Sequence, residues 1–195
     1  MYTFGCFSTP NLETYSMYQG SWSTIPEEYR IKDLGDILDQ GSKGCCVSCS
    51  IYEIYNFYCL SKGKEVDIPY TYTYDNRKDK SLDGQDPGEG FTFMRDQGKI
   101  KTFSRIATLD FLKEAIIANG PCALAMIVRD ASGRNDFWKG SETQPIGHMV
   151  SVVGYTKDSL IIKNSWGYSY GESGLWYLPY DEFNGVVREA WTIIA

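Results

Sequence analysis

Histidine is almost absent from this chain of 195 residues, which contains a single copy. A zinc site built from histidine and cysteine ligands is therefore not expected. The one C-x-x-C match, Cys46 to Cys49, has no second pair at zinc-finger spacing. We expect neither a metal nor a cofactor in this protein.

Clusters of positive charge and long hydrophobic runs are missing as well. The net charge is −6, and the Lys and Arg residues are scattered along the chain. This pattern argues against a nucleic-acid interface and against a basic membrane-binding patch. The longest apolar stretch, AIIANGPCALAMIV, is too short to span a bilayer. We therefore expect no nucleic acid or membrane as a partner, and the oligomeric state stays open.

A secretory leader pattern is also lacking. The first 24 residues contain no Lys or Arg, so they have no charged region of the kind that begins a signal peptide. The six cysteines are then expected to be reduced thiols in a cytoplasmic compartment. For a phage-encoded chain, that compartment would be the host cytoplasm or the virion.

Periodic apolar residues predict two main helices. Residues Val47, Ile51, Ile54 and Tyr58 fall at helical spacing and predict a helix that ends near Leu60. A second amphipathic helix is predicted over residues 109–119, where Gly120-Pro121 would end it. A short helix after Pro87 is expected to end at Gly98.

The second half of the chain is rich in strand patterns. CALAMIV, HMVSVVGY and LIIKN are β-rich runs, and YTKDSL is expected to join the last two as a hairpin. The order of patterns predicts an α+β fold with two segregated lobes. We place an N-terminal extension at residues 1–24 and one domain at 25–195. Its helical lobe covers about 40–105, and its antiparallel sheet lobe covers about 106–195 together with the N-terminal segment.

Cys46 is the candidate nucleophile among the four cysteines of the stretch DQGSKGCCVSCSIYEIYNFYCL. It lies at the start of the first predicted helix, where unpaired N–H groups and the helix dipole favour a thiolate. The alternative for any single cysteine is a small buried core residue. Cys49 and Cys59 are expected to be such packing residues.

Three further residues supply the other groups that thiol catalysis needs. His148 is the one available base, and Asn164 lies across the predicted hairpin, where its amide oxygen could orient the imidazole. The turn is expected near Thr156 to Ser159. A centre at Thr156 would set the two residues directly opposite each other, and a shifted centre would leave them a few pairs apart. Gln40 carries an amide N–H that could stabilise an oxyanion together with the backbone N–H of Cys46.

The residues around these positions resemble a known family. QGSKGCC is similar to the Q-G-x-x-G-x-C motif of papain-like cysteine peptidases, and GHMVSVVGY resembles the histidine strand of that family. KNSWGYSYGESGLWYLPY resembles its asparagine segment, and the order Gln, Cys, His, Asn is the same. The resemblance covers residues 25–195 and implies a two-lobed fold with the active-site cleft between the lobes.

The resemblance also implies roles for individual residues. Cys46 would attack a peptide carbonyl, with His148 as base and later acid, Asn164 orienting His148, and Gln40 in the oxyanion hole. Trp166 would cover the bond between Asn164 and His148 and is expected near the substrate. In the loop around Asp83, Gly84 is expected to bind the substrate backbone.

Several departures from the family pattern leave alternatives open. Fewer residues separate Cys46 from His148 than the roughly 130 to 150 given for papain-like enzymes. Lys43 stands where the family has a disulfide cysteine, and Cys45 where it usually has serine. A catalytically inactive structural or binding relative is one alternative. An amidase or transpeptidase that uses the same site is another. Residues 1–24 are too short for the long inhibitory pro-segment of the family and could be a strand arm, a short mask over the cleft or a partner contact.

Overall fold

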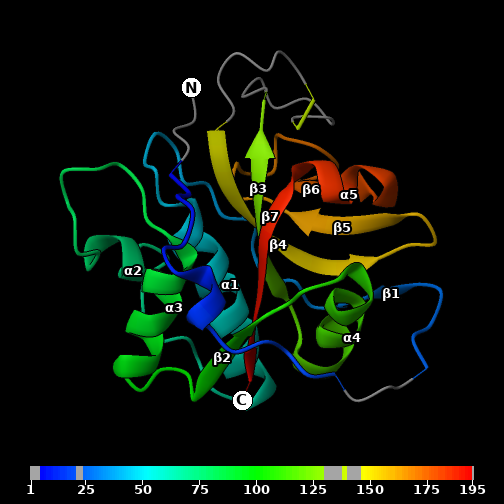
Figure 1. Ribbon diagram of the computed structural model, residues 1–195, viewed down its shortest axis with the longest axis horizontal. Helices are drawn as coiled ribbons and strands as arrows, with labels where there is room; N and C mark the ends of the chain where they lie inside the picture. Colours follow the sequence, from blue (N-terminus) through cyan, green and yellow to red (C-terminus); the bar gives the residue numbers. More distant parts are fainter. Residues whose placement is uncertain (1–4, 21–23, 130–137, 140–145, 195) are drawn as a thin grey trace.

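The computed structural model describes residues 5–20, 24–129, 138–139 and 146–194. Helices gather on one side of the molecule and an antiparallel sheet occupies the other (Figure 1). The helical elements are η1 (Leu12–Thr14), α1 (Cys46–Ser61), α2 (Tyr72–Asp75), α3 (Pro87–Asp96), α4 (Leu109–Asn119) and α5 (Tyr180–Val186). The strands are β1 (Tyr29–Arg30), β2 (Thr102–Arg105), β3 (Cys122–Val128), β4 (Ile146–Tyr155), β5 (Ser159–Lys163), β6 (Leu175–Pro179) and β7 (Val187–Ile194). The predicted α+β fold is confirmed.

The sheet has the strand order β2-β7-β3-β4-β5-β6, with β1 paired to β4. All of these pairs are antiparallel. Strand β2 pairs with β7 and so belongs to the sheet, whereas the sequence placed residues 102–105 in the helical lobe. The reason is that β2 follows α3 closely along the chain but finds its hydrogen-bond partners near the C-terminus.

Local capping explains where two helices begin. The Asp86 side chain accepts from Glu89 N at 2.8 Å, and Pro87 occupies the first turn of α3. Thr108 caps α4 in the same way by accepting from Phe111 N. Helix α4 ends at Gly120, whose φ of 94° suits glycine. The bounds predicted for this helix from the sequence are confirmed.

Strand β3 separates two hydrophobic cores by its alternation. Ala123 and Ala125 face the core that contains α1 and α3. Leu124 and Met126 point to the core that contains α4 and strands β4 to β6. The small alanines on the first face allow α1 to lie close to the sheet, which brings the start of this helix next to β4.

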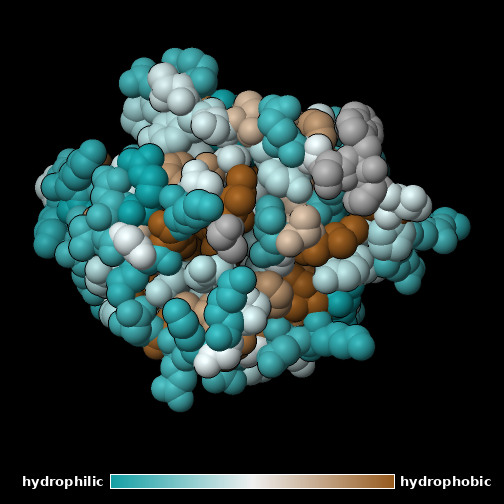
Figure 2. Space-filling model, turned by 90° about the horizontal axis from the view of Figure 1, so that it is seen from below, coloured by the Kyte–Doolittle hydropathy of each residue, from teal (hydrophilic) through white to brown (hydrophobic). Residues whose placement is uncertain are grey.

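Few large apolar side chains reach the surface. The exposed ones among the described residues are Phe7, Leu60, Leu82, Ile146 and Tyr168. Figure 2 shows the lower face, where hydrophilic residues surround several hydrophobic patches near the centre. No helix of the described part of the chain is long and apolar enough to cross a bilayer.

A buried ion pair joins the two sides of the molecule. Lys163 in β5 lies 3.3 Å from the carboxylate of Glu53 in α1, and both side chains are almost fully buried. Lys163 Nζ also donates to the carbonyl of Leu34 at 2.5 Å. Burial raises the pKa of Glu53, and the neighbouring ammonium acts in the opposite direction.

We expect Lys163→Met to lower the free energy of unfolding by about 3–5 kcal/mol, because the Glu53 carboxylate would stay buried without its cation. Urea unfolding followed by fluorescence measures the change. The double variant Glu53→Gln/Lys163→Met is the matched control and should recover most of the loss. A loss of less than about 1 kcal/mol in the single variant would show that the pair behaves as if exposed.

Candidate active site

The candidate nucleophile is the first residue of helix α1. Cys46 follows Cys45, the N-cap residue, whose side chain forms no capping hydrogen bond. The preceding loop is fixed because Gly44 N donates to the Asp83 carboxylate at 2.9 Å. The N–H groups of the first helical turn therefore stay available for a group that carries negative charge.

The protonation state of Cys46 differs from the sequence expectation. The thiol is completely buried, and this burial raises its pKa to about 11. Hydrogen bonds from the backbone of Met149, Gly5 and Val47 act in the other direction. The loss of hydration outweighs these donors, so Cys46 is a neutral thiol at neutral pH in this conformation.

The single histidine lies beside the nucleophile in strand β4. His148 Nε2 is 2.9 Å from Asn164 Oδ1, and both side chains are buried. The same amide oxygen accepts from Ser165 N at 2.8 Å, which fixes its direction. With Nε2 engaged by Asn164, Nδ1 is the ring nitrogen suited to exchange a proton with the thiol. Burial lowers the pKa of His148 to about 4, so the imidazole is neutral as well.

The hairpin that brings His148 and Asn164 together does not set them directly opposite each other. Ser151 pairs with Lys163, and one further step would set Asn164 opposite Val150. The turn lies within residues 156–159, as predicted, and of the two registers left open the shifted one is present. The two side chains still meet because residues on a diagonal of an antiparallel pair are within reach of each other.

Gln40 is hydrogen-bonded to the loop that carries Asn164. Its Oε1 accepts from the Ser165 hydroxyl at 2.5 Å, and its backbone N–H donates to the Ser165 carbonyl at 2.9 Å. Its Nε2 donates one hydrogen to the Lys43 carbonyl at 2.9 Å. These bonds hold the amide in the loop that leads to Cys46, as an oxyanion donor requires.

Trp166 and Gly84 occupy different surroundings. The Trp166 ring is 1% exposed and stacks on His148, with ring centroids 4.9 Å apart. This burial fits the covering role and not the expected contact with substrate. Gly84 is buried, and a Cβ there would come within 2.7 Å of Gly5 O, so the N-terminal residues pack directly against it.

Residues 1–24, for which the sequence left several roles open, include a segment that lies over the nucleophile. Residues 5–9, called the cover segment here, pass between the helices and the sheet (Figure 1). Cys6 N donates to Gly147 O, directly before His148, at 3.1 Å. Residues 1–24 show no apolar period, and all of these partners are distant in sequence. Glycine at position 5 was the one available sign of close backbone packing.

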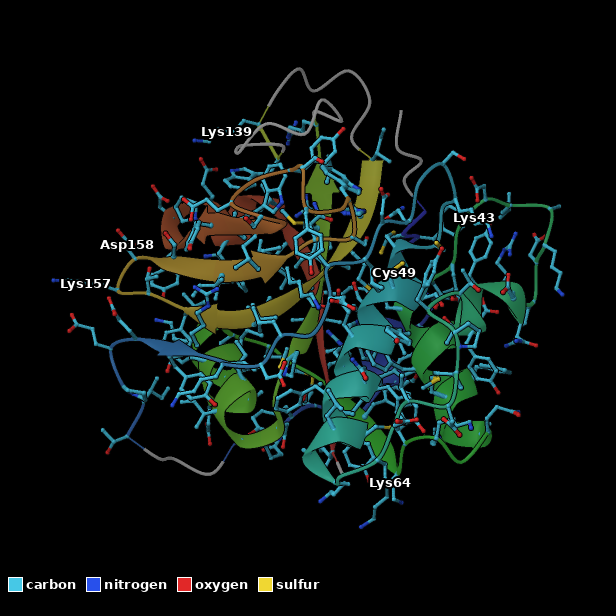
Figure 3. The ribbon with its side chains drawn as sticks, turned by 180° about the vertical axis from the view of Figure 1, so that it is seen from behind. Lys43, Cys49, Lys64, Lys139, Lys157 and Asp158 are labelled. Carbon is cyan, nitrogen blue, oxygen red and sulfur yellow. The ribbon has the colours of Figure 1, made fainter. Side chains whose placement is uncertain are left out.

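The other cysteines are also buried thiols. All six cysteines lie within the described residues, and none forms a disulfide. The Sγ atoms of Cys45 and Cys49 are 3.8 Å apart, and this hydrogen bond is the main reason that the pKa of Cys45 is lowered. Figure 3 shows Cys49 near the end of α1 that faces the site. Within the described ranges, no group of three or more His, Cys, Asp or Glu side chains could hold a metal ion.

Solved structures with this architecture include several cysteine proteases. Xylellain from Xylella fastidiosa superposes with a TM-score of 0.85 at 18% identity, covering 97% of this chain and 95% of its own. A Carica candamarcensis cysteine protease, solved in complex with E-64, superposes with a TM-score of 0.69 at 18% identity. It covers 87% of this chain and 98% of its own. At these identities the likeness shows the fold.

Sequence comparison points to the same group. Cathepsin S from Mus musculus is 29% identical over 150 residues, and the match covers 69% of this chain and 39% of the relative. Mexicain from Jacaratia mexicana is 44% identical over 64 residues, which are 30% of this chain and 28% of the relative. The chain thus spans about two fifths of the length of the cathepsin S relatives. The model of the papain family of cysteine proteases matches residues 36–191, and the chain belongs to this family.

Proposed function

We propose that this protein is a cysteine peptidase that hydrolyses peptide bonds through Cys46, His148 and Asn164. The observation that carries the proposal is the buried 2.9 Å bond between His148 Nε2 and Asn164 Oδ1, next to a thiol at a helix start. A histidine oriented in this way can hold one tautomer and act as a base. Family membership supports the same assignment.

The proposed reaction proceeds in two steps. Cys46 Sγ attacks the peptide carbonyl carbon while His148 Nδ1 accepts the thiol proton, and the amine leaves with that proton. This forms a thioester, which water then hydrolyses with His148 as base, so that the acid is released and the thiol is restored. Neither of these two reaction steps uses a metal ion or a redox partner.

Two donors are suited to the developing oxyanion. The backbone N–H of Cys46 belongs to the uncapped first turn of α1, and the Gln40 amide lies in the loop that leads to it, held by its bonds to Lys43 and Ser165. Such preorganised donors contribute because they are already aligned when charge develops. Asn164 acts through His148 and is a positioning residue.

We expect Cys46→Ala to reduce peptide hydrolysis by about 1,000-fold or more, because no thioester can form. Cys45→Ser is the matched control and should stay within a few-fold of the parent chain. Cleavage of a peptide library measures both, on the full chain and on a variant that begins at Pro10 and so lacks the cover segment. Activity that survives Cys46→Ala, or absence of hydrolysis from both parent forms, would refute the proposed function.

A second substitution tests the positioning role of Asn164. Asn164→Ala should lower kcat by about 100-fold, which is at the lower end of what an aligned acid–base group contributes. KM should change less than two-fold, because Asn164 does not contact the substrate. Steady-state kinetics in the variant that begins at Pro10 separates the two parameters. Equal losses in KM and in thermal stability, with kcat unchanged, would instead assign Asn164 a purely structural role.

A further inference from the structure

Two thiols that the proposed reaction does not use lie against each other beside the nucleophile. The Sγ atoms of Cys45 and Cys49, called the thiol pair here, are 3.8 Å apart, and both side chains are buried. Cys45 is the N-cap residue of α1 and Cys49 lies one turn later, so the two thiols share one face of the helix. Cys49 N donates to the Cys45 carbonyl at 2.9 Å, which closes this first turn.

The surroundings of the thiol pair differ from those of the core residues beside it. Val47 packs in the hydrophobic core that contains α3. Among the described residues, neither thiol of the pair belongs to a hydrophobic core cluster. The charged side chains of Lys43 and Asp83 act on the Cys45 thiol instead. Apolar packing therefore does not explain why two cysteines occupy these positions.

The two thiols of the pair are not equivalent. The hydrogen bond from Cys49 is the main reason that the pKa of Cys45 is lowered, and Lys43 acts in the same direction against burial and Asp83. The same hydrogen bond, followed by burial, raises the pKa of Cys49. Cys45 therefore ionises before Cys49, and the thiolate is the form that an oxidant attacks.

A small oxidant has a short path to Cys45. Residues 41–43, in the loop that leads to α1, are exposed, and Gly44 alone separates them from Cys45. Hydrogen peroxide is little larger than water, so a small movement of this loop admits it. Cys49 then lies at hand to complete a disulfide, because its Sγ already contacts Cys45 Sγ.

A disulfide between these thiols would change the shape of the first helical turn. Residues four apart in a helix have Cβ atoms about 5–6 Å apart, and a disulfide brings its Cβ atoms to about 3.5–4.5 Å. Cys45 can supply this movement because it ends the helix and its side chain makes no capping bond. Cys46 follows Cys45 directly and must move with it. A strained disulfide is also more easily reduced, which makes the change reversible.

We propose that Cys45 and Cys49 are a reversible oxidation site, at which a hydroperoxide converts the two thiols to a disulfide and so displaces the neighbouring nucleophile Cys46. The oxidation depends on the thiol pair alone, and only its effect on peptide hydrolysis rests on the proposed function. Cys45 stands where the family usually has serine, so the pair is a feature of this chain.

The oxidation proceeds in two steps that balance. The Cys45 thiolate attacks hydrogen peroxide, the O–O bond breaks, and a sulfenic acid and hydroxide form. Cys49 Sγ then attacks the sulfur of Cys45, the S–O bond breaks, and the hydroxyl leaves as water with the proton of the Cys49 thiol. The pair loses two electrons to the peroxide. A small dithiol such as dithiothreitol returns them by thiol–disulfide exchange.

The test is brief treatment of the full chain with hydrogen peroxide, after which free thiols are alkylated in denaturant and the disulfide is mapped by mass spectrometry. The parent should lose two of its six thiols, those of Cys45 and Cys49, and dithiothreitol should restore both. Cys59→Ser is the matched control, because Cys59 is a buried thiol of the same helix outside the pair, and it should behave like the parent. Cys49→Ser should form no disulfide and should stop at a sulfenic acid on Cys45, which dimedone traps.

Peptide hydrolysis by the same samples measures the displacement of Cys46. Oxidation of the parent should slow hydrolysis by about 100-fold, which is the cost of misplacing a reacting group by about 1 Å. Dithiothreitol should restore the rate. Cys49→Ser, given the same dose, should keep most of its activity, since it cannot form the disulfide that moves the helix start.

The outcomes separate this inference from the proposed function. If the parent forms no disulfide between Cys45 and Cys49, or joins Cys46 to either of them instead, the oxidation site is overturned whatever the peptidase activity. A Cys45–Cys49 disulfide that leaves hydrolysis unchanged would overturn the displacement of the nucleophile. Formation of this disulfide in a chain that hydrolyses no peptide even when reduced would uphold the oxidation site and refute the peptidase.

Discussion

The close approach of α1 to strand β4 is the constraint on which the site depends. It sets Cys46, the first residue of the helix, against the backbone of Met149 and hence beside His148. Small side chains on the facing side of β3 make this distance possible, because a larger residue than Ala123 or Ala125 would push the helix outward. The sheet lobe then supplies Asn164, which hydrogen-bonds to the imidazole of His148, and Trp166, which stacks on it. The site therefore forms where the start of α1, which carries Cys46, meets strand β4, which carries His148.

Much of this arrangement could be predicted from the sequence because its signals are local. The apolar spacing from Val47 to Tyr58 fixed the course of α1, and Thr108 with Gly120 marked the ends of α4. The motifs around Cys46, His148 and Asn164 placed the candidate residues in the correct order. The hairpin centre was less certain, since alternation alone does not distinguish neighbouring registers when both faces of the strands are buried.

The remaining features depend on contacts between distant parts of the chain. Strand β2 joins the sheet through β7 at the opposite end of the sequence. The cover segment has no periodic pattern, and its partners Gln85, Gly147 and Glu189 come from three separate regions. The pKa of Cys46 could not be foreseen for the same reason. A helix start favours a thiolate, but the burial that opposes it is created partly by residues that no local motif connects to the site.

The burial of His148 has a consequence for how this protein can be observed. It is the one histidine of the chain, and it lies between the Asn164 amide and the Trp166 ring. The imidazole signals in a nuclear magnetic resonance spectrum therefore all belong to His148 and need no further assignment. The ring current of Trp166 shifts those signals, so they report the distance between the two rings. One resonance would follow the site through covering, opening and occupation by a ligand.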